Sequence, residues 1–304
     1  DIFFSMKGKY IASQNLNPDI YFKMKQRDGY VGYKGVPAPA EHLYLNVETS
    51  LPSLDVNKVG GKLDSIYFTI GKEYFSGILN LNGINPPVID AKVRANINVA
   101  NVMHLLDMKD LEVKGILLAD IKSKGTYAPE QKLFPITKGD LEFSEGYVKT
   151  PYYPNPITNI HFKGKVENTD GSMKTLALQL NPLNFLFENK PFTVNLAMEN
   201  FDDIHYDIQA KGELNIAKIY KVFLQKGLEL EGYANADVSL KGTQSDATNG
   251  RYHLLQNKGS IELRNIKTTS EYLPKPFIIQ QGLFRFQQDD MRFTNFRATY
   301  GKSD

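Results

Sequence analysis

The chain has 304 residues and balanced charge, with 36 Lys and Arg against 34 Asp and Glu and a formal net charge of +2. No basic stripe stands out, so nucleic acid is not an expected partner. The absence of Cys excludes disulfides, cysteine metal sites and thiol catalysis. No apolar run approaches the roughly 18 residues of a membrane-spanning helix, and no signal peptide is visible.

An internal repeat is the main feature of the sequence. Residues 98–126 align without a gap with residues 215–243, at an offset of 117 (215 − 98), and 11 of the 29 aligned positions are identical. The same offset relates Pro37-Ala-Pro39 to Pro154-Asn-Pro156, and an offset of 120 relates Lys138-Gly139 to Lys258-Gly259. The repeat predicts that one supersecondary unit recurs, which favours a stacked surface over a compact catalytic pocket.

The offsets divide the chain into residues 1–36 (a partial unit), 37–153 and 154–273 (two units), and 274–304 (a partial unit). Because both ends look truncated and the first residue is Asp1 rather than Met, we expect a fragment of a longer repeat array. The alternative is a gene duplication inside one ordinary β domain. The three extra residues behind the offset of 120 are expected between Thr243 and Lys258, in a solvated turn.

Apolar and polar residues alternate along most of the chain, which predicts strands with one buried and one wet face. Dipeptides such as Asp28-Gly29, Gly60-Gly61 and Asn82-Gly83 are turn signals, and short connections predict antiparallel pairing. In chain order, the alternating apolar sets are Ile66, Phe68 and Ile70; Ala91, Val93, Ala95 and Ile97; Leu141 and Phe143; Leu176, Leu178 and Leu180; Phe192, Val194, Leu196 and Met198; Leu228, Leu230, Ala234, Ala236, Val238 and Leu240.

Two segments follow a helical period instead. Asn98 and Asn215 are expected N-caps, and apolar residues follow each at i, i+3, i+4 and i+7, which is one face of a helix. Each predicted helix has about ten residues and needs packing to be stable. The predicted fold is therefore mainly β: a long curved antiparallel sheet, a groove or half-barrel, built of repeats of 117 residues with one short helix each.

Such a sheet has an apolar face that must be covered. Either the sheet folds over on itself and fills its interior with its own side chains, or it curls into an apolar trough that needs a ligand with an apolar body, such as an acyl chain. Small residues on the expected inner faces fit both outcomes, since they leave room for a ligand or accommodate opposing Phe and Tyr. Sheet geometry and composition alone leave both outcomes open.

Several phrases resemble the AsmA-like family of bacterial envelope proteins. They are Gly139-Asp-Leu-Glu-Phe143-x-x-Gly146 followed by Pro154-x-Pro156-Ile157, Asn181-Pro-Leu followed by Pro191-Phe192, and Lys211-Gly-x-Leu-Asn215 before a short helix. The resemblance covers most of residues 90–304 and is carried by degenerate β-repeat patterns. It implies a periplasmic β body, an inner-membrane anchor missing here, and transport of phospholipid toward the outer membrane along a hydrophobic groove. It carries no catalytic residues.

The sequence and the resemblance together predict a non-enzymatic lipid-handling protein with no cofactor, no metal and no catalytic site. The partners are phospholipid or another acyl lipid, held by non-directional apolar contacts. The candidate groove-lining residues are Val93, Ala95, Val113, Leu141, Phe143, Ile160, Phe162, Leu176, Leu178, Leu180, Val194, Leu196, Leu228, Leu230, Ala236, Val238, Ile261 and Leu263.

A second hypothesis is a β-sandwich array of the cell envelope that binds glycan or protein, or has no ligand. Glycan sites use exposed aromatic rings as stacking platforms, and this chain has no Trp. Tyr147, Tyr152 and Tyr153 cluster beside Pro154 and are the nearest substitute. The simpler interpretation of that cluster is a strand end that packs under a Pro-rich turn.

Overall fold

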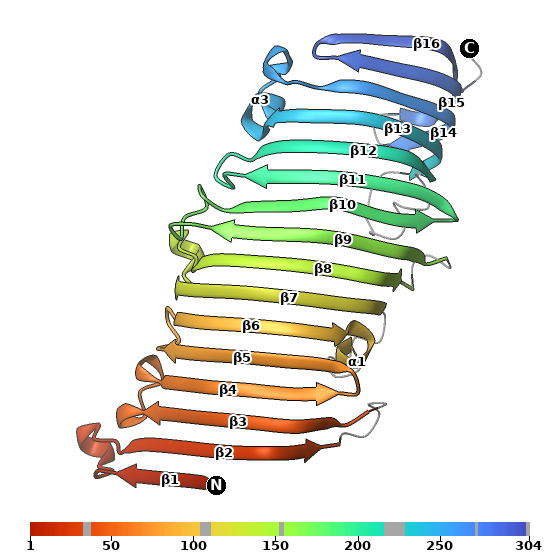
Figure 1. Cartoon of the computed structure of the whole chain (residues 1–304). Helices are drawn as coiled ribbons and strands as arrows, with labels where there is room; N and C mark the ends of the chain where they lie inside the picture. The colour runs from red at the N-terminus through yellow and green to blue at the C-terminus, as the bar shows by residue number, and fades with distance from the viewer. Residues whose placement is uncertain (33–37, 104–110, 152–154, 216–228, 271–272, 302–304) are drawn as a thin grey trace. The chain divides into compact units, whose positions relative to one another are not determined.

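The computed structural model describes residues 1–32, 38–103, 111–151, 155–215, 229–270 and 273–301. Strands account for most of them (Figure 1). The strands are β1 (Ile2–Lys7), β2 (Asp19–Val31), β3 (Ala40–Leu51), β4 (Gly60–Ile70), β5 (Glu73–Asn82), β6 (Val88–Asn98), β7 (Glu112–Thr126), β8 (Ile136–Lys149), β9 (Ile157–Asn168), β10 (Ala177–Phe187), β11 (Lys190–Glu199), β12 (His205–Asn215), β13 (Glu229–Thr243), β14 (Lys258–Ser270), β15 (Leu273–Gln287) and β16 (Asp290–Tyr300).

All 16 strands belong to one sheet, in which each strand pairs with its neighbours in the sequence. The pairs are antiparallel, as at β5–β6 and β11–β12, because connections of a few residues cannot return a strand in parallel. The sheet is not closed, since β1 and β16 stand at its two ends. The prediction of a mainly β protein with a long antiparallel sheet is confirmed.

The period of 117 residues recurs in the strand bounds. β2 begins at Asp19 and β8 at Ile136, which is 117 residues later (136 − 19). Both bounds of β3, β4, β5, β6 and β7 recur at the same offset in β9, β10, β11, β12 and β13. The repeating structure is therefore a six-strand set, from β2 to β7 and again from β8 to β13, and β14 begins a third set.

Irregular positions repeat as well. Asp28 and Glu145, 117 residues apart, both adopt a positive φ, and so do His42 and Asn159. Asp28 lies inside β2, where the register with β3 shifts between Gln26 and Gly29. The expected turn at Asp28-Gly29 is therefore wrong, because the left-handed residue forms a bulge within a continuous strand. Gly60 and Gly61 likewise lie in β4, opposite Asn82 and Leu81, and form no turn.

Compact packing divides the chain into two units, which are described separately below. Unit 1 comprises Asp1–Asp107, Ile116–Glu142 and Lys165–Ala177, and unit 2 comprises Met108–Gly115, Phe143–Gly164 and Leu178–Asp304. Among the described residues of each unit, the strand contacts join neighbours in the sheet. A second sheet packed face to face, as in a sandwich, is not found within the described part of either unit.

The first predicted helix begins where the sequence places it. Helix α1 (Val99–Met103) follows β6, and Asn98 Oδ1 accepts a hydrogen bond from the backbone N–H of Ala100 at 3.0 Å, as an N-cap does. Residues 104–110 lie outside the described part of the chain. The whole second predicted helix, after Asn215, also lies there.

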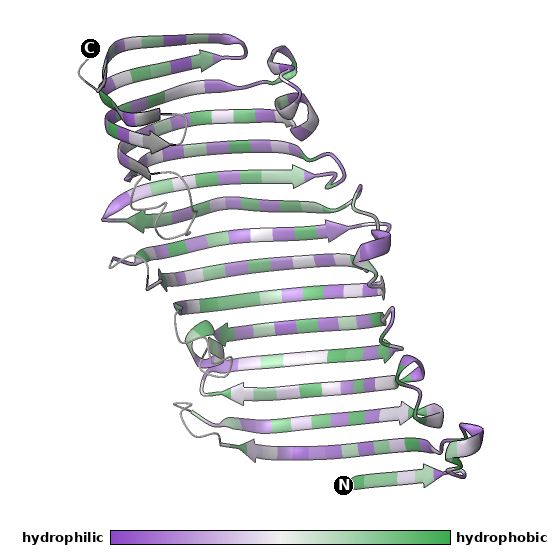
Figure 2. Ribbon diagram, turned by 180° about the vertical axis from the view of Figure 1, so that it is seen from behind, coloured by the Kyte–Doolittle hydropathy of each residue, from purple (hydrophilic) through white to green (hydrophobic). Residues whose placement is uncertain are grey.

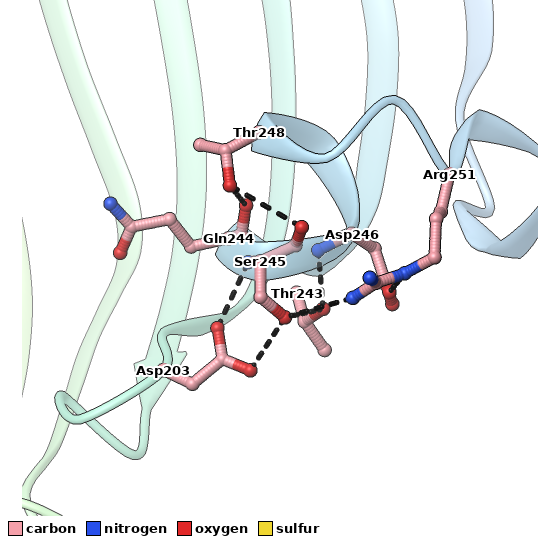
Figure 3. A network of polar contacts seen from close by, with 7 residues as sticks. All are labelled: Asp203, Thr243, Gln244, Ser245, Asp246, Thr248 and Arg251. Carbon is pink, nitrogen blue, oxygen red and sulfur yellow. Dashed lines mark hydrogen bonds and ion pairs between the residues drawn. The ribbon is translucent and has the colours of Figure 1, made fainter.

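The segment expected to be a solvated turn contains a helix instead. Helix α3 (Gln244–Thr248) follows β13, and Thr243 Oγ1 accepts a hydrogen bond from Asp246 N at 3.2 Å (Figure 3). Asp203, in the turn before β12, accepts hydrogen bonds from the backbone N–H and hydroxyl of Ser245 at 2.9 and 2.8 Å. Arg251 Nε donates to Asp246 Oδ1 at 2.7 Å and closes the network. The change of offset from 117 to 120 thus falls in an ordered loop.

Candidate functional site

Unit 1 presents a continuous apolar face. Residues directly opposite each other in antiparallel strands point to the same side of the sheet. Reading the register from strand to strand, that side carries Ile2, Phe4 and Met6 on β1; Ile20, Phe22 and Met24 on β2; Leu45 and Val47 on β3; Leu63, Ile66 and Phe68 on β4; Phe75, Leu79 and Leu81 on β5; Ile89, Ala91, Val93, Ala95 and Ile97 on β6; and Leu117, Ala119 and Ile121 on β7.

Unit 2 presents an apolar face of the same kind. Its strands also alternate between hydrophobic and hydrophilic residues (Figure 2). The register places on one side Val194, Leu196 and Met198 of β11; Ile208 and Ala210 of β12; Ala234, Ala236, Val238 and Leu240 of β13; Ile261 and Leu263 of β14; Phe284 and Phe286 of β15; and Met291 and Phe293 of β16.

Glycines let large side chains lie flat on these faces. A Cβ on Gly115 would lie 2.6 Å from Cζ of Phe143, and a Cβ on Gly146 would lie 2.4 Å from Cε1 of the same ring. Phe143 is only 8% exposed, and its ring centroid lies 5.6 Å from that of Phe162. Among the described residues, the groups that lie against the ring come from its own strand and the neighbouring strands.

Most other side chains on the apolar faces remain half-buried. Val93, Leu79 and Ile121 in unit 1 are of intermediate exposure, as are Leu196 and Val238 in unit 2. The described α-helices have five residues each and the 3-10 helices three, too small to cover a sheet. Within the described parts of the two units, the apolar faces are therefore accessible, which is unusual for contiguous apolar surface in a water-soluble protein.

The opposite face in each unit is polar and carries ion pairs. In unit 1, Lys23 pairs with Glu48 and Arg94 Nε lies 2.9 Å from Asp120 Oδ2. The hydrogen bond from Lys23 lowers the pKa of Glu48 below its usual range, and the same bond raises the pKa of Lys23. Exposed pairs contribute about 1 kcal/mol or less each. Charged side chains on this face keep it hydrated.

Unit 2 has the same polar arrangement, with Lys211 Nζ 2.8 Å from Asp237 Oδ2 and Lys241 Nζ 3.2 Å from Asp207 Oδ2. Each pair joins directly opposed positions of β12 and β13. The two faces of each unit therefore differ in what they can bind: one offers mainly apolar contact, and the other offers charge and hydrogen bonds.

The structure places most of the predicted lining residues on the apolar faces. In unit 1 the register gives Val93 and Ala95, and Leu141 lies two residues from Gly139, whose Cβ would touch Ile121. In unit 2 the register or close contacts place on that face Phe143, Ile160, Phe162, Leu180, Val194, Leu196, Ala236, Val238, Ile261 and Leu263.

Five predicted lining residues stand apart from that set. Val113 and Leu178 are placed on the apolar face only by strand alternation, because they lie two residues from Gly115 and Leu180 respectively. Leu176 precedes the first residue of β10 and is not in a strand. Leu230 lies in β13 opposite Thr268, but its side chain is outside the description, and Leu228 lies entirely outside the described residues.

Sequence reasoning missed two hollows, and both lie mainly over polar-face residues. One in unit 2 has a volume of about 850 Å³ and includes Lys258, Ser260, Arg285 and Arg292. One in unit 1 has a volume of about 340 Å³ and includes Tyr21, Glu48 and Lys62. The repeats align Tyr21 and Glu48 with Lys258 and Arg285 at a common offset of 237 (258 − 21), but only the cross-strand register brings these residues together.

Other kinds of site find no support in the part of the chain that the structure describes. No group of three or more metal-ligating side chains occurs among those residues. None of their helices is long and apolar enough to cross a membrane. Of the Tyr cluster, Tyr152 and Tyr153 lie outside the description, and the ring of Tyr147 has Lys114 Nζ 5.0 Å from its centroid. That cation occupies the stacking surface a sugar would use.

Comparisons with models of protein families, with curated proteins and with solved structures give no match for this chain. The features of the chain that bear on function are therefore the apolar face of each unit and the polar surface opposite it.

Proposed function

We propose that the chain is a non-enzymatic protein of the periplasm that binds phospholipid acyl chains on its apolar sheet face and passes lipid toward the outer membrane. The observation that carries the proposal is the apolar face within each unit, which continues across consecutive strands while its side chains stay half-buried. The periplasmic setting and an inner-membrane anchor in the full-length protein are proposed from the resemblance to AsmA-like proteins.

An acyl chain suits this surface better than a polar ligand does. The register places rows of aliphatic and aromatic side chains there, as in Leu63–Leu79–Ala91 of unit 1 and Leu196–Ile208–Leu240 of unit 2. Such rows offer no hydrogen-bond partner to a glycan hydroxyl, which would lose its water without compensation. An acyl chain gains about 25 cal/mol for each Å² of apolar surface it buries.

Small residues add room along the same rows. Ala91, Ala95 and Ala119 lie on the apolar face of unit 1, and Ala210, Ala234 and Ala236 on that of unit 2. A ligand without shape-specific groups uses such space at many positions, so binding is expected to be distributed along the face. Movement of lipid from one row to the next then needs no single tight site.

The first test is lipid extraction from the purified chain. The protein is expressed in a Gram-negative host, purified under mild conditions and extracted with organic solvent, and the extract is examined by lipid mass spectrometry. Near-stoichiometric phospholipid, absent from a β-sandwich protein of similar size treated in parallel, is the expected result. An extract no richer in phospholipid than the control would count against the proposal.

A matched pair of variants on β10 tests the face itself. Leu178→Asp introduces a charge among apolar neighbours, whereas Gln179→Asp introduces the same charge at the adjacent, exposed position. Desolvation of the carboxylate should make Leu178→Asp lower the uptake of a fluorescent fatty acid by about tenfold or more, while Gln179→Asp leaves uptake near that of the parent chain. Equal uptake by two folded variants would refute the proposed surface.

The alternative is a cell-envelope array that binds glycan or protein, or has no ligand. It would use the polar face or strand edges in place of the apolar face. Glycan arrays or pull-downs with folded protein that contains no lipid would favour it. If this alternative holds, the two β10 variants should also bind acyl chains equally, because the apolar face has no ligand.

A further inference from the structure

We propose that the larger hollow on the polar face of unit 2 is a binding site for a phosphate-bearing anion. The site is centred on Arg285 of β15, with Lys258 and Ser260 of β14 and Arg292 of β16 around it. It lies on the opposite side of the sheet from the apolar rows, so the inference does not rest on the proposed lipid function. It concerns a different ligand group and a different set of side chains.

Three cations are concentrated in neighbouring strands at this place. Arg285 is directly opposite Arg292 in the β15–β16 pair, and Lys258 is one diagonal place from Arg285 in the β14–β15 pair. Directly opposed residues have Cβ atoms about 5 Å apart, and like charges there are destabilising. Two opposed arginines therefore repel each other unless anions, from the protein or from solution, neutralise them.

The acids in the vicinity do not neutralise all three cations. Asp290 makes two hydrogen bonds with Arg292, from Nε at 3.2 Å and from Nη2 at 2.8 Å. Asp237 also lines the hollow, opposite Ser260, but its carboxylate is paired with Lys211. Within the described residues, Lys258 and Arg285 have no ion-pair partner, and Glu262, diagonal to Arg285, makes none with it.

The repeat shows what has changed at this position. In the first six-strand set, Lys23 and Glu48 form an ion pair across β2 and β3. At the equivalent place 117 residues later, Asp140 and Lys165 lie 3.9 Å apart. A further 120 residues on, the same place holds Ser260 opposite Arg285. The acid has become a serine, and the cation is left free to bind an external anion.

The neighbouring replacements point the same way. The smaller hollow in unit 1 holds Tyr21 and Glu48 where the larger one holds Lys258 and Arg285, so a neutral and an acidic side chain are replaced by two cations. A guanidinium offers parallel N–H donors that match phosphate oxygens, an ammonium adds a point charge, and the Ser260 hydroxyl donates one hydrogen bond. These are the groups that bind a phosphate monoester.

In the test, inorganic phosphate is titrated into the full chain. Its binding is measured by isothermal titration calorimetry at low and at physiological ionic strength. Saturable binding of phosphate, stronger than that of chloride, is expected. Arg285→Gln removes the central guanidinium, and Ser260→Asp restores the acid that the second six-strand set has at this position, Asp140. Each should weaken phosphate binding by about tenfold or more, since hydrogen bonds to charged groups are lost or occupied.

The control is Arg94→Gln, which removes an equal charge from a paired arginine on the polar face of unit 1. It should leave phosphate binding unchanged, and circular dichroism should give all variants the same strand content. Vesicles of phosphatidylcholine with and without phosphatidic acid identify the source. The anion would be assigned to a lipid headgroup if the chain bound only the vesicles that contain phosphatidic acid, did not bind free phosphate, and lost vesicle binding in the two site variants. The absence of saturable binding, or equal binding by all the variants, would overturn the proposal.

Discussion

Gly115 and Phe143 fit each other across two neighbouring strands of unit 2. A Cβ at position 115 would lie 2.6 Å from Cζ and 2.7 Å from Cε2 of the Phe143 ring, which is closer than real Cβ atoms come to other atoms. Gly115 also has a φ of +140°, where an L side chain is strained. The glycine therefore provides both the backbone conformation and the space that let the ring lie against β7.

Replacing this glycine is the first prediction. Gly115→Ala should lower the free energy of unfolding by about 1–3 kcal/mol, from backbone strain and ring displacement. Denaturation followed by circular dichroism measures the change, since the chain has no Trp. Gly61→Ala is the control: its Cβ would meet Leu81 Cβ at an ordinary 3.6 Å, so a change of about 0.5 kcal/mol or less is expected. Equal losses from both substitutions would contradict the fit.

Asn168 leads to a second prediction, about a turn in unit 1. It is 2% exposed, accepts a hydrogen bond from Gly171 N at 2.7 Å and donates one to Ser172 O at 3.0 Å. Asn168→Ala leaves these buried backbone groups without partners and should cost about 1–3 kcal/mol. Asn168→Asp keeps the acceptor but places a buried carboxylate oxygen against Ser172 O, so a loss at least as large is expected. A neutral Asn168→Ala in denaturant titrations would show that water replaces the side chain.

The alternation of apolar and polar residues was sufficient to predict the fold class, because a period of two fixes which side of a strand faces the core. The same signal placed Val93 on the apolar face of unit 1, and Leu196 and Val238 on that of unit 2. It failed at Asp28-Gly29, since a dipeptide that tolerates positive φ suits both a hairpin turn and a bulge. Only the pairing of β2 with β3 distinguishes the two.

The ordered loop after β13 had a sequence signal that alternation does not use. Thr243 and Asp246 have the spacing of a helix N-cap and an acid in the first turn, which is typical of a helix start. The tertiary partner of that helix, Asp203, lies 42 residues from Ser245 and could not be inferred from spacing. The hollow around Arg285 depends equally on cross-strand register, which the sequence alone does not give.

This loop has a predictable dependence on pH. Hydrogen bonds from Arg251 and then Thr243 hold the pKa of Asp246 below its ordinary value of 3.8. A carboxyl with a depressed pKa in the folded state contributes stability above its unfolded pKa and loses it as the pH falls through the folded value. We therefore expect α3 to loosen only in that acidic window, below pH 3.8.

Carbon-detected NMR of the Asp246 carboxyl, together with the amide shifts of Ser245 and Arg251, measures this transition. The amide shifts should change together with the carboxyl titration. Asp246→Asn should abolish the coupled change, because the side chain can no longer titrate. Amide shifts that move at the ordinary Asp value, or that move equally in the variant, would show that Asp246 does not control the loop.

The last prediction concerns the apolar face of unit 1, where a matched pair lies on β5. Leu79 is opposite Leu63 and Ala91, whereas Asn80, the next residue, is opposite Lys62 and Asp90 on the polar face. Leu79→Asp places a carboxylate among apolar neighbours, so acyl-chain uptake by the chain should fall several-fold. Asn80→Asp adds the same charge beside water and a lysine, so uptake should remain close to that of the parent chain.

Both variants are compared by fatty-acid titration of delipidated protein, with circular dichroism to establish folding. A loss of uptake in Leu79→Asp alone would extend the lipid surface from unit 2, where Leu178 tests it, to unit 1. Normal uptake in a folded Leu79→Asp, combined with a loss in Leu178→Asp, would confine lipid binding to unit 2. If neither apolar-face variant changed uptake, acyl chains would have to bind elsewhere, because the charges stand in the middle of the only rows proposed to hold them.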